Sequence, residues 1–320
     1  MVGIIDVEVA FPAGRRTVQQ MHELSGRPVA DILAWTHCPE IPVFDEHEQA
    51  WELQADIARK VLDRAGVDAS EIGQVIVGGG GDWDVPSWSP AAKIAAELGV
   101  TDAHCFEVLN FCSSSSASLQ VAGDAITLGR TKYSLLLFGE RVGRSIDCTD
   151  PESVSLFNVG DAAAAVLLGP GHGRFELLRT QTRSEPTWSD FLSGEIDGER
   201  MVIRLRGRQR GISKMYLERY QSLIREALTA LDLTPDDVDH FVINQVDRRM
   251  HERLLDTLGI PFERSVFNYH RLGHMSSTDP FIGLCDLRDA GRLADGDLIL
   301  LATSGFGFSW GVTALRYRDR

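Results

Sequence analysis

The sequence lacks two features, and each absence excludes a class of protein. None of the apolar runs in the 320 residues approaches the roughly 18 residues that a membrane-spanning helix needs. Basic residues are outnumbered, because 32 Lys and Arg stand against 46 Asp and Glu, for a formal net charge of -14. Phosphate contacts require clustered positive charge, so this balance argues against a nucleic-acid partner, although it allows a local basic patch.

Cysteine is also rare, with five residues at wide and uneven spacing and no CxxC pair. An odd number without paired spacing argues against a disulfide framework and against a zinc site, so we expect no metal and a cytoplasmic location. The N-terminal segment MVGIIDVEVAFPAG is apolar but contains Asp6 and Glu8, which predicts a first strand rather than a signal peptide. Hydrophobic residues at 43% indicate a globular chain, long enough for two domains.

Short β-branched runs alternate with helical segments along the chain. The runs predict strands at Gln74–Val77, Phe106–Leu109, Leu135–Phe138, Phe241–Ile243 and Leu298–Ala302. The helical segments are His47–Ala65, Pro90–Leu98, Ser113–Leu128, Ser213–Leu231, Met250–Leu258 and Asp279–Ala290. This alternation predicts an α/β fold whose strands are covered by helices.

The chain resembles itself at long range. VLDRAGVDASEIGQVIVG ends at Gly78 and ALTALDLTPDDVDHFVIN ends at Asn244, an offset of 244 minus 78, or 166 residues. In each half a further strand is expected, at Phe106–Leu109 and near Val266. A period of half the chain is too long for a solenoid, so we expect two similar halves, 1–170 and 171–320, about a pseudo-twofold axis.

The repeat predicts where chemistry takes place. Cys112 follows the strand Phe106–Leu109 and precedes a helix, and His274 occupies the comparable place in the second half. Asn244 ends another strand. Because ligand sites of α/β sheets lie at the carboxyl ends of strands, an axis between the halves would gather these three side chains at one centre.

Each candidate also has a plainer interpretation. A cysteine at a helix start is favoured as a thiolate by the helix dipole, and the small residues SSSSAS after Cys112 allow close packing; a buried structural cysteine is the alternative. His274 is a candidate base, with His270 as a weaker rival, and either histidine alone would more often belong to a surface loop. Asn244 alone would more often cap a turn.

Two glycine motifs are set aside. Residues 307–311, GFSWG, match the G-x-S-x-G pattern, but no His follows them to complete a hydrolase triad. GGGGDW at 78–83 has neither the lysine of a phosphate-binding loop nor the spacing of a dinucleotide site. It predicts a tight turn, with close backbone approach to a ligand as the second interpretation.

Together these residues resemble the ketoacyl synthase III branch of the thiolase superfamily, from about Asp56 to Tyr317. The motifs that carry the resemblance are EVLNFCSSSSASLQVA, FNVGDAAAAVLLG, NQVDRRM and ATSGFGFSWGVTALRY. The resemblance implies a duplicated five-layered α/β/α/β/α fold, a homodimer, and an acyl-cysteine intermediate on Cys112. It also implies an oxyanion hole made by the backbone N–H groups of Cys112 and Phe306, where the family usually has glycine at 306.

The chain departs from this family at the partners of the cysteine. The family has His where this chain has Asn244, and Asn where this chain has His274, so the pair is exchanged. The family uses its pair to bind a malonyl thioester during decarboxylation. The exchange leaves a nucleophile, an oxyanion hole and one base, which suffice for acyl transfer.

Two further sets of residues follow from the resemblance. Trp83 and Trp88 match the region that shapes the acyl pocket, and indicate a bounded pocket for a short, branched or aromatic group. The residues that match carrier-protein docking positions, or extend them, are Lys214, Arg248 and Arg249. Ordinary solvated charges are the alternative for these three.

The sequence therefore predicts a homodimeric acyltransferase without a cofactor. An acyl group would pass from a carrier-protein or coenzyme A thioester to Cys112, and then to an oxygen, nitrogen or sulfur of a small-molecule acceptor, in polyketide or other natural-product biosynthesis. His274 would act as the base and Asn244 as a hydrogen-bonding group. The alternatives are decarboxylative condensation with a malonyl thioester, and a non-catalytic partner subunit of a synthase.

Overall fold

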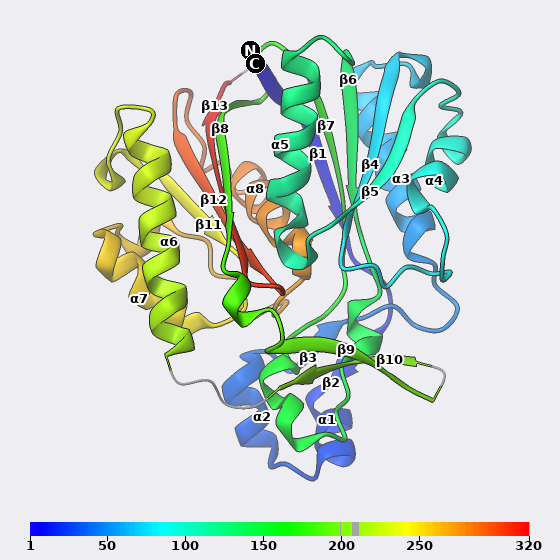
Figure 1. The fold of residues 1–320 in the computed structure, drawn as a ribbon, viewed down its shortest axis with the longest axis vertical. Coiled ribbons are helices and arrows are strands. Elements are labelled where there is room, and N and C mark those ends of the chain that lie inside the picture. The colour runs from blue at the N-terminus through cyan, green and yellow to red at the C-terminus, as the bar shows by residue number, and fades with distance from the viewer. Residues whose placement is uncertain (199, 207–210, 320) are drawn as a thin grey trace.

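One continuous sheet with helices on both faces organises the chain (Figure 1). The computed structural model describes residues 1–198, 200–206 and 211–319. The strands of the sheet lie in the order β11-β12-β13-β8-β1-β7-β6-β4-β5. In chain order they are β1 (Val2–Ala10), β4 (Ile72–Gly79), β5 (His104–Leu109), β6 (Tyr133–Phe138), β7 (Ala163–Pro170), β8 (Phe175–Ser184), β11 (His240–Ile243), β12 (Leu298–Gly305) and β13 (Ser309–Tyr317).

Each of the six predicted helices is present, with ends that differ from the predicted ones by a few residues at most. They are α3 (Ala50–Ala65), α4 (Pro90–Leu98), α5 (Ser114–Thr127), α6 (Ile212–Thr229), α7 (Arg248–Leu258) and α8 (Asp279–Asp289). Side-chain caps decide two of the starts: Ser89 accepts from the N–H of Ala92 before α4, and Asp247 accepts from the N–H of Met250 before α7. Such caps satisfy N–H groups that a helix leaves without a partner.

The strand order confirms the internal repeat. In the first half β4, β6, β7 and β1 are neighbours, paired parallel, antiparallel and antiparallel. In the second half β11, β12, β13 and β8 follow the same order with the same directions. The two series meet where β1 pairs with β8 through Gly3 and Ile4. The predicted boundary at 170/171 falls between the end of β7 and the start of β8.

The repeat is incomplete at one edge, so the predicted strand near Val266 is wrong. Only a single bridge joins Phe241 to Ser265 there, and the N–H of Val266 donates to the carbonyl of Phe241. A single bridge does not start a ladder, and the chain leaves the edge of the sheet. As a result, β5 has no equivalent among the strands that the structure describes in the second half.

The helices form three layers that alternate with the two series of strands (Figure 1). α5 and α8 lie in the middle, and the rings of Phe138 on β6 and Phe281 on α8 stack with centroids 5.0 Å apart. α3 and α4 cover the outer face of the first series, and α6 and α7 cover that of the second. This is the predicted five-layered arrangement. Strands β4, β6, β7, β12 and β13 are almost wholly buried, whereas β8 is partly exposed. Helix α5, which follows Cys112, lies between the two series at the centre of the molecule.

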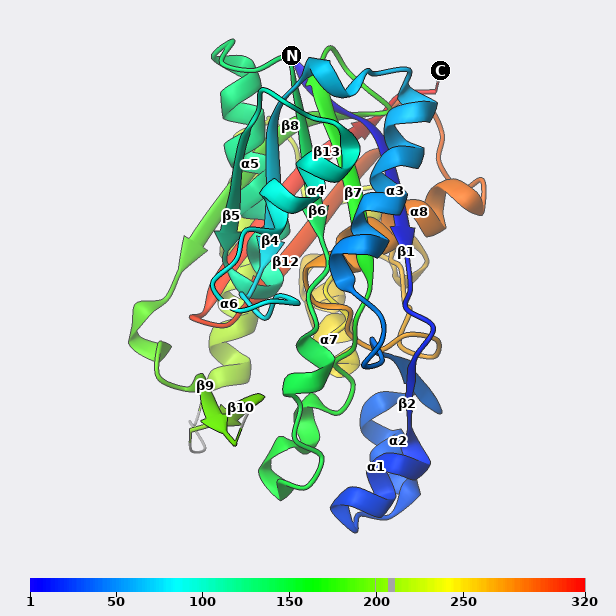
Figure 2. The ribbon, with the colours of Figure 1, turned by 90° about the vertical axis from the view of Figure 1, so that its right-hand side faces the viewer.

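Two small additions lie together at one end (Figures 1 and 2). The first is an excursion after β1, made of β2 (Arg15–Thr17), α1 (Val18–Ser25), α2 (Val29–Thr36) and β3 (Glu40–Pro42). The second is the hairpin of β9 (Leu192–Asp197) and β10 (Arg200–Leu205). The sequence patterns predicted neither. Along the described residues, no helix combines the length and apolar character that crossing a bilayer requires.

Candidate active site

Strand ends from both halves converge on one cavity. Residues that follow β4, β5, β6 and β12 line it, namely Gly80, Cys112, Glu140 and Phe306. All are at carboxyl ends of strands, where α/β sheets place ligand sites. His274 lines the same cavity from the loop before α8. The predicted meeting of the two halves at one centre is thus present.

Cys112 reaches this centre through a sharp turn. After β5 the chain makes a short 3-10 turn at Phe111–Ser113, and Phe111 adopts a φ of +49°. A bulky residue in this left-handed region is strained, and such strain concentrates at functional sites. The turn leaves the Cys112 side chain buried yet in contact with the cavity.

The serines after Cys112 allow its helix to lie deep in the molecule. Ser113 Oγ donates to the carbonyl of Ser309, and Ser116 Oγ lies 2.8 Å from Thr303 Oγ1. A Cβ on Gly311 would lie 2.3 Å from that of Ser116. Larger side chains in this stretch would push α5 away from β12 and β13, and with it the backbone of Cys112.

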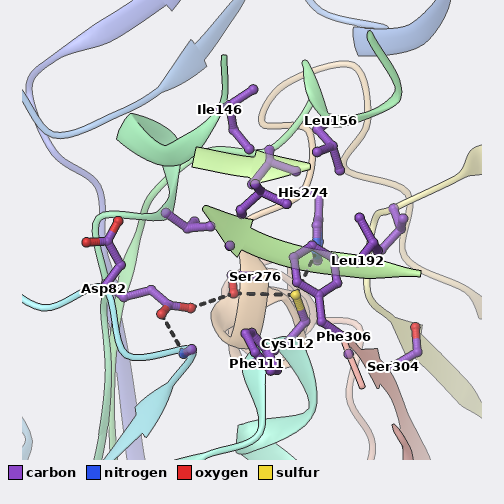
Figure 3. Close-up of a pocket in the computed structure, with 18 of the residues that line it drawn as sticks. Asp82, Phe111, Cys112, Ile146, Leu156, Leu192, His274, Ser276, Ser304 and Phe306 are labelled. Carbon is purple, nitrogen blue, oxygen red and sulfur yellow. Dashed lines mark hydrogen bonds between the residues drawn. The ribbon is translucent and has the colours of Figure 1, made fainter. Parts of the chain in front are cut away.

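His274 is the histidine that meets the cysteine. Its Nε2 lies 3.2 Å from the Sγ of Cys112, and its backbone N–H donates to the carbonyl of Asn158. His270, the rival, is exposed on the surface. The structure therefore brings together the two side chains on which the predicted chemistry depends (Figure 3).

Asp279 completes a chain of three groups that the sequence did not predict. Its Oδ2 accepts from Nδ1 of His274 at 2.6 Å and from the N–H of Gln245, and its Oδ1 accepts from the N–H of Met275. A carboxylate accepts only, so Nδ1 carries a hydrogen and Nε2 faces the sulfur free to take a proton. Cys112, His274 and Asp279 are thus arranged as nucleophile, base and orienting acid.

The charges on either side of His274 favour its protonated form. Burial by itself lowers the pKa of His274, but the Cys112 thiolate and the Asp279 carboxylate outweigh it and raise that pKa to about 10. The imidazolium lies between the Asp279 carboxylate and the Cys112 thiolate and stabilises both. Without it, each of them would be a buried negative charge without a partner. The site therefore favours the protonated form of His274 when Cys112 is a thiolate.

Asn244 lies near this centre but supports it from behind. Its Nδ2 donates to the carbonyl of Ser276 at 3.0 Å, and its Oδ1 accepts from the N–H of Ser304 at 2.8 Å. It is not among the residues that line the cavity. The side chain thus ties the loop of His274 to the end of β12.

The turn between β12 and β13 lies against the backbone of the nucleophile. A Cβ on Gly305 would lie 2.8 Å from the carbonyl oxygen of Asn110 and 3.2 Å from the nitrogen of Cys112. Phe306 follows and lines the cavity, with its ring 5.4 Å from that of Phe111. Gly307 and Phe308 adopt left-handed backbone, but Phe306 does not, so position 306 tolerates a side chain. The turn therefore lies directly beside the backbone nitrogen of Cys112.

The cavity encloses about 210 Å³ and is mostly apolar. Its apolar residues come from the β9–β10 hairpin and from the segments after β5, β6, β11 and β12; they are Phe111, Val142, Ile146, Leu156, Val159, Leu192, Met201, Ile203, Val246 and Phe306. Figure 3 labels five of them, Phe111, Ile146, Leu156, Leu192 and Phe306. Neither Trp83 nor Trp88 lines it, and Trp83 packs instead against Gly79. The β9–β10 hairpin, whose sequence showed no recognisable signal, thus forms part of the cavity wall.

The three predicted docking residues are exposed, and each lies close in the sequence to a residue that lines the cavity. Lys214 begins α6 two residues before Tyr216, which lines the cavity. Arg248 and Arg249 begin α7, just after the lining residue Val246. Lys214 and Arg248 form exposed ion pairs within their own helices, and such pairs hold side chains only weakly. Each of the three is thus an exposed basic residue within a few positions of a residue that lines the cavity.

Comparison with known proteins gives the site a family. Residues 106–186 match the family described as 3-Oxoacyl-[acyl-carrier-protein (ACP)] synthase III, and residues 228–317 match its C-terminal part. The beta-ketoacyl-[acyl-carrier-protein] synthase III of Rhodospirillum centenum is 30% identical over 277 residues, covering 84% of each chain. The same enzyme of Rhizorhabdus wittichii is 29% identical over 279 residues, covering 86% of each.

Solved structures share the fold. 3-Oxoacyl-[acyl-carrier-protein] synthase III from Aquifex aeolicus superposes with a TM-score of 0.88 at 24% identity, over 99% of this chain and 100% of that one. The priming beta-ketosynthase of a polyketide pathway superposes with a TM-score of 0.89 at 23% identity, over 100% and 97%. The chain therefore belongs to the 3-oxoacyl-[acyl-carrier-protein] synthase III family, a family of condensing and acyl-transferring enzymes with the thiolase fold.

Proposed function

We propose that this member of the family is an acyltransferase that moves an acyl group from a carrier-protein or coenzyme A thioester to a small-molecule acceptor. The observation that carries the proposal is the buried chain from Cys112 through His274 to Asp279. It supplies a nucleophile and one oriented base, which is what two successive acyl transfers require.

In the first transfer His274 Nε2 holds the proton of the Cys112 thiol while Sγ attacks the thioester carbonyl carbon. The backbone N–H groups of Cys112 and Phe306 hold the oxyanion. As the new carbon–sulfur bond forms, the bond to the donor sulfur breaks. The departing thiolate takes the proton from His274.

In the second transfer the acceptor hydroxyl, amine or thiol gives its proton to His274 Nε2 and attacks the acyl carbon. The bond to Cys112 Sγ breaks, and the enzyme returns to its thiolate–imidazolium state. Asp279 stabilises the imidazolium in both transfers and keeps Nε2 aimed at the reacting atoms. Asn244 contributes by holding the two loops that carry Ser276 and Ser304.

Decarboxylative condensation is the second candidate, because the curated relatives are named as 3-oxoacyl synthases. The lining of the cavity disfavours a malonyl carboxylate. Its described residues include the carboxyl groups of Asp82 and Glu140 and no Lys or Arg. In the acyl-enzyme His274 has given its proton to the departing thiolate, so an anionic group would then meet no positive side chain among these residues. A non-catalytic role is disfavoured by the intact contact between Cys112 and His274.

The proposal is tested by intact mass measurement after incubation with acyl thioesters. A stable acyl adduct is expected on the native chain and not on Cys112→Ala, and transfer to an added alcohol or amine should discharge it. If the adduct does not form with any thioester, the function is wrong. Release of carbon dioxide from a malonyl carrier protein, with a new carbon–carbon bond, would favour condensation instead.

A homodimer is proposed as the working form. β5 is the edge strand of the sheet and is only half-buried, and Leu109 at its end is 64% exposed. Val85 and Val121 nearby are also exposed. Such an edge favours pairing with another strand, and a second copy about a twofold axis presents the same edge. Leu109→Arg is expected to yield monomers in light scattering, and an unchanged mass would contradict this interface.

A further inference from the structure

A second buried acid reaches the nucleophile from the side opposite to His274. Glu140 follows β6, is 5% exposed and lines the cavity. Its Oε2 accepts from the N–H of Gly80, and its Oε1 accepts from Ser276 Oγ at 3.0 Å. Ser276 Oγ also lies 3.5 Å from the Sγ of Cys112. Figure 3 shows the contact between Ser276 and the sulfur of Cys112.

The run of four glycines after β4 makes room for this carboxyl group. A Cβ on Gly79 would lie 2.9 Å from Glu140 Oε2, and one on Gly80 would lie 3.2 Å from it. The same Cβ on Gly80 would lie 2.8 Å from the ring of Phe111. The motif at 78–81 thus brings its backbone close to the side chains beside the nucleophile, rather than to a phosphate.

The hydroxyl of Ser276 has one hydrogen for two acceptors. When Glu140 is ionised, its carboxylate is the stronger acceptor and takes that hydrogen, so the serine oxygen turns lone pairs toward the sulfur. When Glu140 is protonated, the acid can donate to Ser276 Oγ. The serine hydrogen is then free to point at the thiolate.

We propose that Glu140 and Ser276 form a positioning relay on Cys112, in which the neutral acid directs the serine hydrogen to the sulfur and the ionised acid withdraws it. The relay rests on the proposed function only in treating Cys112 as the nucleophile. Neither residue forms a bond to the acyl group. The relay supports the thiolate when it attacks and when it leaves.

The groups around Glu140 place its titration in a useful range. Burial raises its pKa to about 7, the N–H of Gly80 and the hydroxyl of Ser276 oppose the rise, and the carboxylates of Asp82 and Asp161 add to it. The Cys112 thiolate and the His274 imidazolium face it through Ser276, and Arg144 is paired with Asp82. Below the pKa the neutral acid supports the thiolate. Above this pKa the Ser276 hydroxyl donates to the ionised Glu140 instead of to the sulfur. The negative charge of Glu140 then faces the thiolate through the serine.

Glutamine at position 140 copies the neutral state. Its oxygen can accept from the N–H of Gly80 while its amide donates to Ser276 Oγ, so the relay stays directed at the sulfur at every pH. Ser276→Ala removes the hydrogen altogether. A matched control is Glu107→Gln, because Glu107 accepts from Ser89 Oγ at 2.7 Å in a similar pair remote from the cavity.

The test is the rate of iodoacetamide alkylation at Cys112 as a function of pH, quantified on the Cys112 peptide by mass spectrometry. The native chain should show an inflection near pH 7 that Glu140→Gln abolishes, with the variant about tenfold more reactive above it, the effect of one hydrogen bond to a charged group. Ser276→Ala should react about tenfold more slowly below the inflection. Glu107→Gln should follow the native profile.

Superimposable profiles of the native chain and Glu140→Gln would overturn the relay, as would native reactivity in Ser276→Ala. Thermal unfolding of each variant shows whether it is folded, and a merely structural role would not remove the inflection. Acylation by thioesters is a separate readout. An inflection without acylation would refute the proposed function and leave the relay, and acylation without an inflection would do the reverse.

Discussion

Asp279→Asn should slow acylation of Cys112 far more than it weakens the fold. Asparagine keeps the size of the side chain but replaces one acceptor oxygen by an amide donor. At the place of Oδ1 this donor would face the N–H of Met275, and at the place of Oδ2 it would face both Nδ1 of His274 and the N–H of Gln245. The imidazole can relieve this conflict by moving its hydrogen to Nε2. In that tautomer Nε2 cannot accept the proton of Cys112, so the base is lost.

The lost charge gives the magnitude. Two unit charges about 4 Å apart interact by about 4 kcal/mol at the effective dielectric constant of about 20 that suits protein sites. Since about 1.4 kcal/mol is a factor of ten, acylation should fall about a thousandfold. Asp279 is also among the groups that raise the pKa of His274, so its removal lowers that pKa. The thiolate–imidazolium pair then forms only at higher pH, and the pH at which alkylation is half-maximal should rise.

The assay is the rate of acyl-adduct formation by quenched mass spectrometry, measured over the same pH series as alkylation. Asp286→Asn is the matched control, because Asp286 lies on the same helix but pairs with Arg271 near the surface. Thermal unfolding of both variants separates catalysis from folding. If Asp279→Asn acylates within about threefold of the native rate at every pH, Asp279 does not orient the base and the three-group assignment fails.

Three other perturbations have expected outcomes. The first is charge reversal of the exposed basic residues Lys214, Arg248 and Arg249. It should raise KM several-fold for a carrier-protein thioester but not for a small thioester, and an equal rise of KM for both would contradict docking. Gly305→Ala should prevent acylation, since its Cβ would lie 3.2 Å from the nitrogen of Cys112, and a native rate would refute this. Burial and nearby Arg248 lower the pKa of His251 to about 3, so below about pH 6.5 the unfolded chain binds a proton that the folded chain does not. Acid should therefore lower the free energy of unfolding by up to about 5 kcal/mol through this group, and His251→Gln should flatten that dependence in denaturation curves at several pH values.

Helices and central strands were predictable because their signals are local. α4 begins at Pro90 after the capping Ser89, as the sequence indicates, and β12 is a continuous apolar run. The repeat was also visible, because both halves bury most of their strands between helices and so keep the same order of apolar strands and amphipathic helices. The strand near Val266 was mispredicted because an apolar run forms a strand only where a neighbour offers a ladder, and one bridge is all it finds.

The site divides in the same way. Cys112 was identified from its place after β5, and His274 from the comparable place before α8, although the strand expected ahead of it near Val266 is not formed. Asp279 was missed because an acid at the start of a helix is common for capping alone, and nothing local shows that it meets the imidazole. Glu140 gave no signal, because its importance lies in a contact with Ser276, 136 residues away in the chain.

The sequence by itself determined the order of most elements and the internal repeat, because hydrophobic period and caps act over a few residues, and it made Cys112 the candidate nucleophile through the family resemblance. Only the tertiary structure decided which acids face the nucleophile and its base, and which residues form the wall of the cavity. Those contacts join Asp279, Glu140 and the β9–β10 hairpin to the centre through packing between distant segments, and distance along a chain does not specify proximity in space.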